Sequence, residues 1–283
     1  IEMGQGLMTK ISQIAANELG LSTDEIKITS TDTEKVPNTS ASAASASTDI
    51  NGAAVVNAIN TIKNNLASFI NKNFKYKGKS IKYKSNKVLF GSKSIDFKKL
   101  ISLAHLNRIS LSSSGFYKTP KIFRNKETLK GRPFLYFSYG AAVSEVIIDT
   151  LTGENKLLQV DILHDVGKSI NPSIDLGQIE GGFVQGLGWL TTEEVSWNLN
   201  GNLSTHSPST YKIPVSKDIP EKFNVNIYEK GLNIEKTVNR SKAVGEPPLM
   251  LALSTFMALK NAVNNNNLKA PATPENILMA LQE

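Results

Sequence analysis

Residues 241–248 place Glu246 between a glycine and two consecutive prolines, and this pattern constrains the fold more than any other in the chain. Proline presets a helical φ and needs no amide donor, so Pro247 or Pro248 suits the first position of a helix. The 11 mostly apolar residues 249–259 follow directly. The pattern therefore predicts a helix that begins at the prolines, with Glu246 just outside it. Because this run is apolar on all sides, we expect it to be fully buried.

Glu246 is the best candidate for a catalytic base in this chain. At the start of a helix its carboxylate lies at the positive end of the helix dipole, which favours the ionised form. A general base must be ionised in order to accept a proton. The alternative interpretation is a glutamate that only caps the helix, since capping acids greatly outnumber catalytic ones.

Helical and strand patterns alternate along the 283 residues without a strict βαβ period, which predicts an α+β fold of mixed helices and short sheets. Apolar spacing predicts helices at residues 7–19 and 55–70, and Pro274 begins a final helix. Strands are predicted at residues 26–31, 143–148, 157–162 and 223–227. Gly153 lies in the connection between the second and third of these strands, which we expect to form a hairpin.

A lysine-rich segment lies between Lys72 and Lys99. It holds ten of the 32 Lys and Arg residues but a single acid, Asp96. No helix-turn-helix, zinc-finger or aromatic RNA-binding pattern accompanies these lysines, so the net charge of +7 does not indicate a nucleic-acid partner. We interpret the segment as a solvated insertion with short strands, followed by a helix that Asp96 begins.

Composition excludes several kinds of site. The chain has no cysteine, which excludes a disulfide scaffold, thiolate zinc sites and iron–sulfur clusters within it. Its three histidines, His105, His164 and His206, lack metal-ligand spacing and are interpreted as surface or packing residues. No stretch approaches the roughly 18 apolar residues of a membrane-spanning helix. We therefore expect no membrane partner.

Two Gly-Gln turns are candidates for cofactor contacts: Gly4-Gln5-Gly6 before the first helix, and Gly177-Gln178 beside a second apolar helical pattern. Glycines let backbone amides approach a ligand closely, and glutamine offers a donor and an acceptor to a heterocycle. Neither turn fits the dinucleotide fingerprint or the phosphate-binding P-loop. The alternative is that the glycines serve tight turns or close helix packing.

Residues 40–47 consist only of serine and alanine. Small side chains allow a backbone to pack directly against a bulky ligand, and the hydroxyl groups could bond its phosphate or ring oxygens. The alternative is a flexible linker.

Six motifs, in this order and over nearly the whole chain, resemble the molybdenum-binding domain of the xanthine dehydrogenase/oxidase family. They are Glu2-Met-Gly-Gln-Gly-Leu, Val36-Pro-Asn-Thr-Ser-Ala-Ser-Ala-Ala-Ser, Gly115-Phe-Tyr-Lys-Thr-Pro, Asp175-Leu-Gly-Gln-Ile-Glu-Gly-Gly-Phe-Val-Gln-Gly-Leu-Gly, Pro208-Ser-Thr-Tyr-Lys-Ile-Pro and Ser241-Lys-Ala-Val-Gly-Glu-Pro-Pro. The resemblance weakens between Lys72 and Lys99, where the sequence looks lineage-specific. The Val-Gly-Glu-Pro-Pro form is similar to xanthine dehydrogenases, whereas aldehyde oxidases tend toward Gly-Leu-Gly-Glu-Ser.

The resemblance implies an oxidoreductase that hydroxylates purines, hypoxanthine to xanthine and xanthine to urate, at a molybdenum–molybdopterin centre. Glu246 would be the base that deprotonates a molybdenum-bound hydroxide, which then attacks the electrophilic ring carbon. The alternatives are an aldehyde oxidase-like molybdenum hydroxylase and a noncatalytic cofactor-binding module.

The resemblance also implies which residues hold the cofactor. Two glutamines would contact the pterin, two alanines would line the molybdenum centre through their backbone without a side-chain ligand, and two serines would help to hold the cofactor. In that order these residues are Gln5 and Gln178, Ala43 and Ala44, and Ser45 and Ser47.

The resemblance places residues 1–283 in the C-terminal portion of the molybdopterin-binding domain. Ile1 is not a start methionine, so we expect a fragment of a longer polypeptide. The resemblance implies that the longer polypeptide contains 2Fe-2S clusters and FAD and uses NAD, all outside this chain. The residues that orient the purine would also lie outside this chain. By the same resemblance the expected partners are a purine substrate, the remaining domains and a second copy in a homodimer, and the expected compartment is the cytoplasm or the peroxisome.

Overall fold

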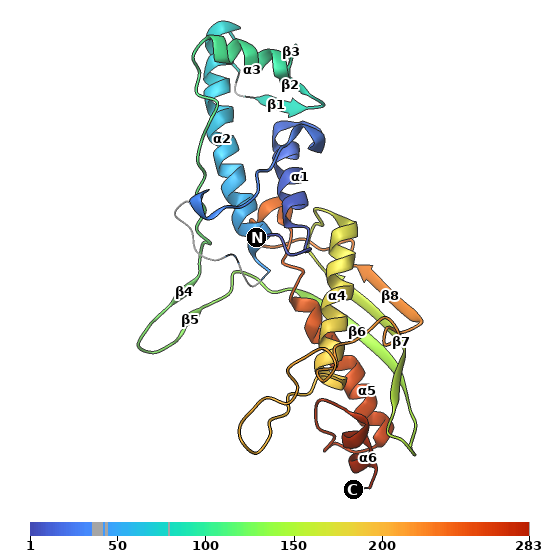
Figure 1. Cartoon of the computed structure of the whole chain (residues 1–283). Helices are drawn as coiled ribbons and strands as arrows, with labels where there is room; N and C mark the ends of the chain where they lie inside the picture. The colour runs from blue at the N-terminus through green and yellow to red at the C-terminus, as the bar shows by residue number, and fades with distance from the viewer. Residues whose placement is uncertain (36–41, 43–44, 79, 283) are drawn as a thin grey trace. The chain divides into compact units, whose positions relative to one another are not determined.

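The computed structural model describes residues 1–35, 42, 45–78 and 80–282 (Figure 1). The chain divides into two compact units. Unit 1 comprises Ile1–Tyr136 and Asn233–Ser241, and unit 2 comprises Phe137–Leu232 and Lys242–Glu283. Both units combine helices with small sheets, which confirms the predicted α+β class.

Unit 1 is built around two helices, α1 (Leu7–Leu19) and α2 (Ser47–Asn73), which pack side by side (Figure 1). Helix α2 begins eight residues before the predicted 55–70. The other helical elements of unit 1 are η1 (Thr23–Glu25), η2 (Thr33–Lys35), α3 (Phe97–Leu106) and η3 (Val238–Arg240), and its strands are β1 (Ile81–Lys84), β2 (Lys87–Phe90), β3 (Lys93–Asp96), β4 (Phe123–Arg124) and β5 (Gly131–Arg132).

The lysine-rich segment folds as predicted into short strands and a helix. Strands β1, β2 and β3 form an antiparallel sheet in that order. Asp96 is the N-cap of α3, and its side chain accepts a hydrogen bond of 3.0 Å from the Lys99 amide. Apolar residues of the sheet and of α3 share a core with the C-terminal half of α2, including Leu66 and Ile70, each 0% exposed.

The strand predicted at residues 26–31 is absent from the described structure. Ile26 and Ile28 are partly buried and alternate with exposed neighbours, as a strand pattern requires. Within the described part of unit 1 they have no neighbouring strand with which to pair. The prediction was wrong because an alternating pattern identifies one face of a strand but not the partner that a strand needs.

Unit 2 contains one sheet, in the order β6 (Tyr139–Ile148), β7 (Asn155–Asp165) and β8 (Lys222–Ile227). Strands β6 and β7 pair antiparallel and form the predicted hairpin, with Gly153 at φ 75° in the connection. Strand β8 pairs parallel with β7. The helical elements are α4 (Pro172–Thr191), η4 (Pro247–Ala252), α5 (Leu253–Val263) and α6 (Pro274–Gln282).

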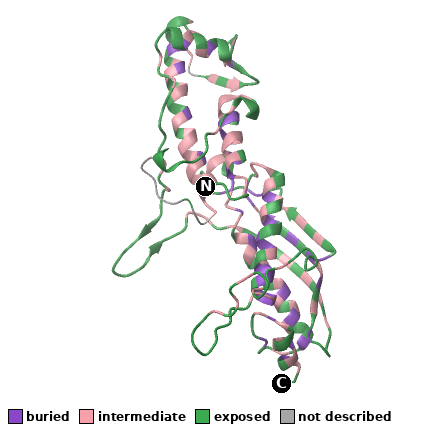
Figure 2. Cartoon of the chain, in the orientation of Figure 1, coloured by how far each residue is buried: buried purple, intermediate pink, exposed green. Residues whose placement is uncertain are grey.

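The core of unit 2 lies between the sheet and α4, along which buried positions gather (Figure 2). Val160 from β7 and Ile179 and Phe183 from α4 are each 0% exposed. A second cluster joins α5 and α6 through Leu259 and Ile277. This packing fixes α4 on the sheet, and α4 in turn is the surface against which η4 lies.

The apolar run of residues 249–259 is not fully buried. Met250, Leu253 and Met257 are 50%, 43% and 59% exposed, whereas Ala252 and Leu259 are 0% exposed. The exposed residues are spaced three and four apart and therefore share one face of the helix. The prediction was wrong because a run that is apolar on every side does not indicate which faces have a neighbour. No helix in the described part of the chain is long and apolar enough to cross a membrane.

His164 on β7 gives unit 2 a predicted pH dependence. The residue is 2% exposed, and within the described residues neither ring nitrogen has a hydrogen-bond partner. Burial lowers the pKa of His164, the Asp165 carboxylate opposes this, and the Lys242 ammonium lowers it further. The unfolded chain therefore takes up a proton near pH 6.5 that the folded unit resists, so stability should fall as the pH drops below about 6.5.

We expect hydrogen–deuterium exchange of the β7 amides in the complete protein, corrected for the intrinsic rate, to accelerate between about pH 7 and about pH 5. His164→Met should remove this acceleration, whereas the same change at the exposed His105 should leave it intact. An unchanged pH profile in the His164 variant would contradict this account.

Candidate functional site

Glu246 lies where the sequence predicts it. It is the N-cap residue of η4, and Pro247 and Pro248 occupy the first positions of that helix. The helix begins as six residues of 3-10 helix and continues directly into α5. Glu246 is exposed, and among the described residues no amide of this first turn donates a capping hydrogen bond to its side chain. The side chain of Glu246 therefore makes no capping hydrogen bond to this first turn.

Two glycines of α4 allow the backbone around Glu246 to lie directly on that helix. A Cβ added at Gly182 would come within 3.1 Å of Pro248 Cβ and 3.2 Å of the Gly245 oxygen. A Cβ added at Gly186 would lie 2.4 Å from the Leu249 oxygen, a distance that real Cβ atoms essentially never show. The close contact of η4 with α4 thus requires glycine at position 186 and favours it at position 182.

The segment before Glu246 is anchored by a partly buried ion pair. Lys242 Nζ lies 2.6 Å from Asp165 Oδ2 at the end of β7, and the two side chains are 6% and 16% exposed. The same ammonium lies 4.9 Å from the centre of the Tyr139 ring, within the range of a cation–π contact. Ser138 Oγ donates a hydrogen bond of 3.1 Å to the Ala243 carbonyl. Glu246 is therefore held between this anchor and the contact with α4.

Gln178 lies within α4, one helical turn before Gly182 and on the same face. The structure therefore brings Gln178 and the segment that carries Glu246 to one side of α4. A Cβ added at Gly177 or Gly181 would have no described atom within 4 Å. These glycines give α4 an open strip without side chains beside Gln178, against which a flat ring system could lie.

Gln5 lies in unit 1, in the turn before α1. Its Oε1 accepts a hydrogen bond of 2.6 Å from the Met3 amide, and its Nε2 donates one of 2.8 Å to the Ile1 carbonyl. The side chain therefore stabilises its own turn.

The amides of this turn bind the Glu2 carboxylate. Glu2 accepts hydrogen bonds from the amides of Gly4 and Gly6 at 3.0 Å and of Met8 at 2.9 Å. The bond from Met8 contributes most to lowering the pKa of Glu2. We expected these amides to approach a ligand, but in the structure a side chain of the chain itself occupies them.

Ser45 and Ser47 lie at the start of α2 in unit 1. Ser45 has φ 56°, and Ser47 is the first residue of the helix. The Asn51 side chain donates hydrogen bonds to the Ser47 carbonyl at 2.8 Å and to Ser42 Oγ at 3.1 Å. The described part of the Ser/Ala segment is thus tied to α2. The predicted alanines 43 and 44 lie outside the described residues.

Two pairs of charged or polar residues beside these candidates were not predictable from local sequence patterns. One is the Lys242–Asp165 ion pair; the other is a hydrogen bond from the Tyr136 hydroxyl to Asp49 in the first turn of α2. The members of these pairs are 77 and 87 residues apart in sequence, so no local pattern could reveal them. Only the position of Asp49, two residues after Ser47, was a signal available in the sequence.

Comparison with known proteins identifies the family. Residues 1–220 match the family model of the molybdopterin cofactor-binding domain. The chain belongs to this family. It is 47% identical over 289 residues to the xanthine dehydrogenase/oxidase of Felis catus, in an alignment that covers 98% of this chain and 20% of that protein. The resemblance that the six motifs predicted is therefore confirmed, although Glu246 lies outside the residues that the family model matches.

Two solved structures share the fold of this molybdopterin cofactor-binding domain. Quinoline 2-oxidoreductase from Pseudomonas putida 86 matches with a TM-score of 0.85 at 21% identity, over 100% of this chain and 36% of that chain. Aldehyde oxidoreductase from Desulfovibrio gigas matches with a TM-score of 0.77 at 23% identity, over 99% of this chain and 28% of that chain. The chain spans about a fifth of the length of the curated relatives it matches.

The two kinds of glycine on α4 should respond differently to alanine. In the complete protein, Gly186→Ala should force η4 away from α4 at a cost of about 1–3 kcal/mol, seen as faster hydrogen exchange of the α4 amides. In the complete protein freed of cofactor, Gly181→Ala meets open space and should slow that exchange, because alanine favours a helix over glycine by up to about 1 kcal/mol. Equal effects of the two changes would show that η4 does not depend on this contact.

Proposed function

We propose that the complete protein is a molybdenum hydroxylase that acts on purines such as hypoxanthine and xanthine, with Glu246 as its general base. The observation that carries the proposal is the setting of this carboxylate. It is exposed at a helix start, does not cap that helix within the described structure, and lies between two fixed anchors. The 47% identity to a xanthine dehydrogenase/oxidase supports the purine class of substrate.

The residues of this chain fit a molybdopterin. In unit 2 the open glycine strip of α4 leaves room for a flat heterocycle, and Gln178 beside it offers a donor and an acceptor. Gln5, Ser45, Ser47 and the backbone of residues 43 and 44 are proposed as cofactor contacts from the resemblance alone. When bound, the molybdenum cofactor supplies the centre that accepts electrons from the substrate.

Glu246 takes part in the reaction through proton transfer. Its carboxylate accepts the proton of the oxygen nucleophile as that oxygen adds to the electrophilic ring carbon, which makes the nucleophile more reactive. The Lys242–Asp165 anchor and the contact with α4 hold the backbone on both sides of Glu246, which limits the positions that its carboxylate can reach.

The complete protein would supply what this chain lacks. By its relation to xanthine dehydrogenases it would contain 2Fe-2S clusters and FAD, use NAD and form a homodimer. The residues that orient the purine would come from the remaining polypeptide. Aldehyde hydroxylation is the alternative activity, because an aldehyde oxidoreductase shares the fold. A comparison of xanthine with an aromatic aldehyde as substrates of the complete enzyme separates the two.

Glu246→Gln in the complete enzyme tests the role of the carboxylate. The change preserves the size of the side chain but removes the base, so anaerobic reduction by xanthine should slow by roughly 10²-fold or more, measured by stopped-flow absorbance. Molybdenum and pterin content should stay at the wild-type level. Glu221→Gln is the matched control, since Glu221 is 84% exposed and carries the same charge in the same unit.

A near-normal rate with full cofactor content would refute the role of Glu246. The absence of molybdenum and pterin from the gently purified wild-type protein would instead support a module without catalytic activity.

A further inference from the structure

Asp49 is a partly buried carboxylate that the proposed reaction does not use. It lies in the first turn of α2, two residues after Ser47, and accepts a short hydrogen bond from the Tyr136 hydroxyl. Burial raises the pKa of Asp49 to about 6, while the bond from Tyr136 and the charge of Lys10 act in the opposite direction. An aspartate in this environment is held by specific partners and is not a solvated helix-start acid.

Three groups from different parts of unit 1 face Asp49. Lys10 comes from α1 and is only 6% exposed. Tyr136 donates the hydrogen bond, and Tyr117 lies close enough for Asp49 to raise the pKa of its phenol, although burial raises it more. Glu235 contributes a further increase to the pKa of Tyr117. The carboxylate is thus the common neighbour of α1, α2 and the segments that carry the two tyrosines.

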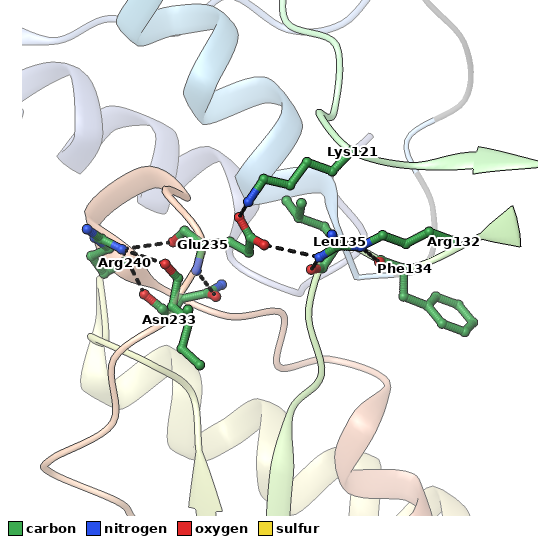
Figure 3. Close-up of polar contacts among 8 residues, drawn as sticks. Lys121, Arg132, Phe134, Leu135, Asn233, Glu235 and Arg240 are labelled. Carbon is green, nitrogen blue, oxygen red and sulfur yellow. Dashed lines mark hydrogen bonds and ion pairs between the residues drawn. The ribbon is translucent and has the colours of Figure 1, made fainter.

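A polar cluster holds the backbone directly before Tyr136, the residue that donates to Asp49 (Figure 3). Glu235 accepts from Lys121 Nζ at 2.6 Å and from Arg132 Nη2 at 3.1 Å. Arg132 also donates to the carbonyl oxygens of Leu135 at 3.0 Å and Phe134 at 3.4 Å. These contacts restrain the backbone from which the Tyr136 side chain extends.

Ser45 and Ser47 are linked to Asp49 through the first turn of α2. Asn51, on the next turn of the helix, bonds the Ser47 carbonyl and Ser42 Oγ. Ser45 adopts φ 56°, a conformation that non-glycine residues rarely hold without support from their surroundings. A shift in the first turn of α2 would move these serines directly.

We propose that Asp49 is a positioning residue for the cofactor: through Tyr136 and Lys10 it fixes the first turn of α2, and with it Ser45 and Ser47, in the place where they hold the molybdopterin. This inference rests on the proposed cofactor site.

The charge of Asp49 distinguishes a role in positioning the cofactor from a role in stabilising the fold, because the two roles predict opposite effects of removing it. Because its folded pKa is raised from 3.8 to about 6, the folded state favours the protonated form. Its contribution to stability is full below about pH 4 and is lost as the pH rises through about 6. At neutral pH the ionised carboxylate therefore costs stability. Asp49→Asn removes this cost and keeps an oxygen that can accept from Tyr136, but it loses the attraction to Lys10.

The test uses the complete enzyme and measures release of the pterin by its fluorescence during dialysis, together with retained molybdenum. At pH 7.5, Tyr136→Phe and Asp49→Ala should each speed release by roughly tenfold or more, the factor expected for one charge-assisted hydrogen bond. Asp49→Asn, which keeps the acceptor for Tyr136 but not the charge that attracts Lys10, should recover only part of this loss. Asp96→Asn, which changes the helix-start acid of α3 in the same unit, should release pterin at the wild-type rate.

Release from the wild type should also accelerate as the pH falls through about 6, the pKa of Asp49, while Asp49→Asn should show no such step. Thermal unfolding of Asp49→Asn at pH 7.5 should occur at or above the wild-type temperature. If Asp49→Ala fails to fold, the Tyr136 and asparagine variants decide the question.

Wild-type release rates in Tyr136→Phe, or a pH step that persists in Asp49→Asn, would overturn the inference while leaving the molybdenum cofactor in place. A wild-type enzyme that contains neither pterin nor molybdenum would instead overturn the proposed function itself.

Discussion

Direct contact between the backbone of η4 and the glycine face of α4 is the interaction on which the arrangement of unit 2 depends. Ile179 and Phe183 fix α4 on the sheet, and each fully buried apolar side chain contributes about 1.5–3 kcal/mol. On the face of α4 toward η4, by contrast, the packing requires that side chains be absent, because a side chain at Gly186 would collide with the Leu249 carbonyl. The position of Glu246 therefore follows from core packing on one face of a helix and from the absence of side chains on another.

Local features of the sequence predicted local features of the structure. The prolines at 247 and 248 begin a helix, Asp96 caps one, and Gly153 closes a hairpin, because each effect depends only on residues close in the chain. Features that depend on a partner were not predictable in this way. Residues 26–31 have a strand pattern without a neighbouring strand, and the helix after Glu246 is apolar on a face that the described chain leaves exposed.

In the candidate site, too, residues within local motifs could be predicted from the sequence, whereas contacts between residues distant in sequence could not. Motifs identified Glu246 and Gln178, and the structure brings both to one side of α4. Asp165 and Tyr136, which bond residues close in sequence to these candidates, find their partners across long stretches of sequence and carry no motif of their own. The Gly-Gln-Gly turn shows a further limit, since no pattern could indicate that Glu2 binds its amides.

Unit 1 is discontinuous, because Asn233–Ser241 joins it only after most of unit 2 has passed along the chain. Glu235 pairs with Lys121 and Arg132 across 114 and 103 residues. During synthesis unit 1 therefore cannot close until the ribosome has released the chain as far as Ser241. Until then Arg132, which donates to the backbone beside Tyr136, lacks its acidic partner Glu235.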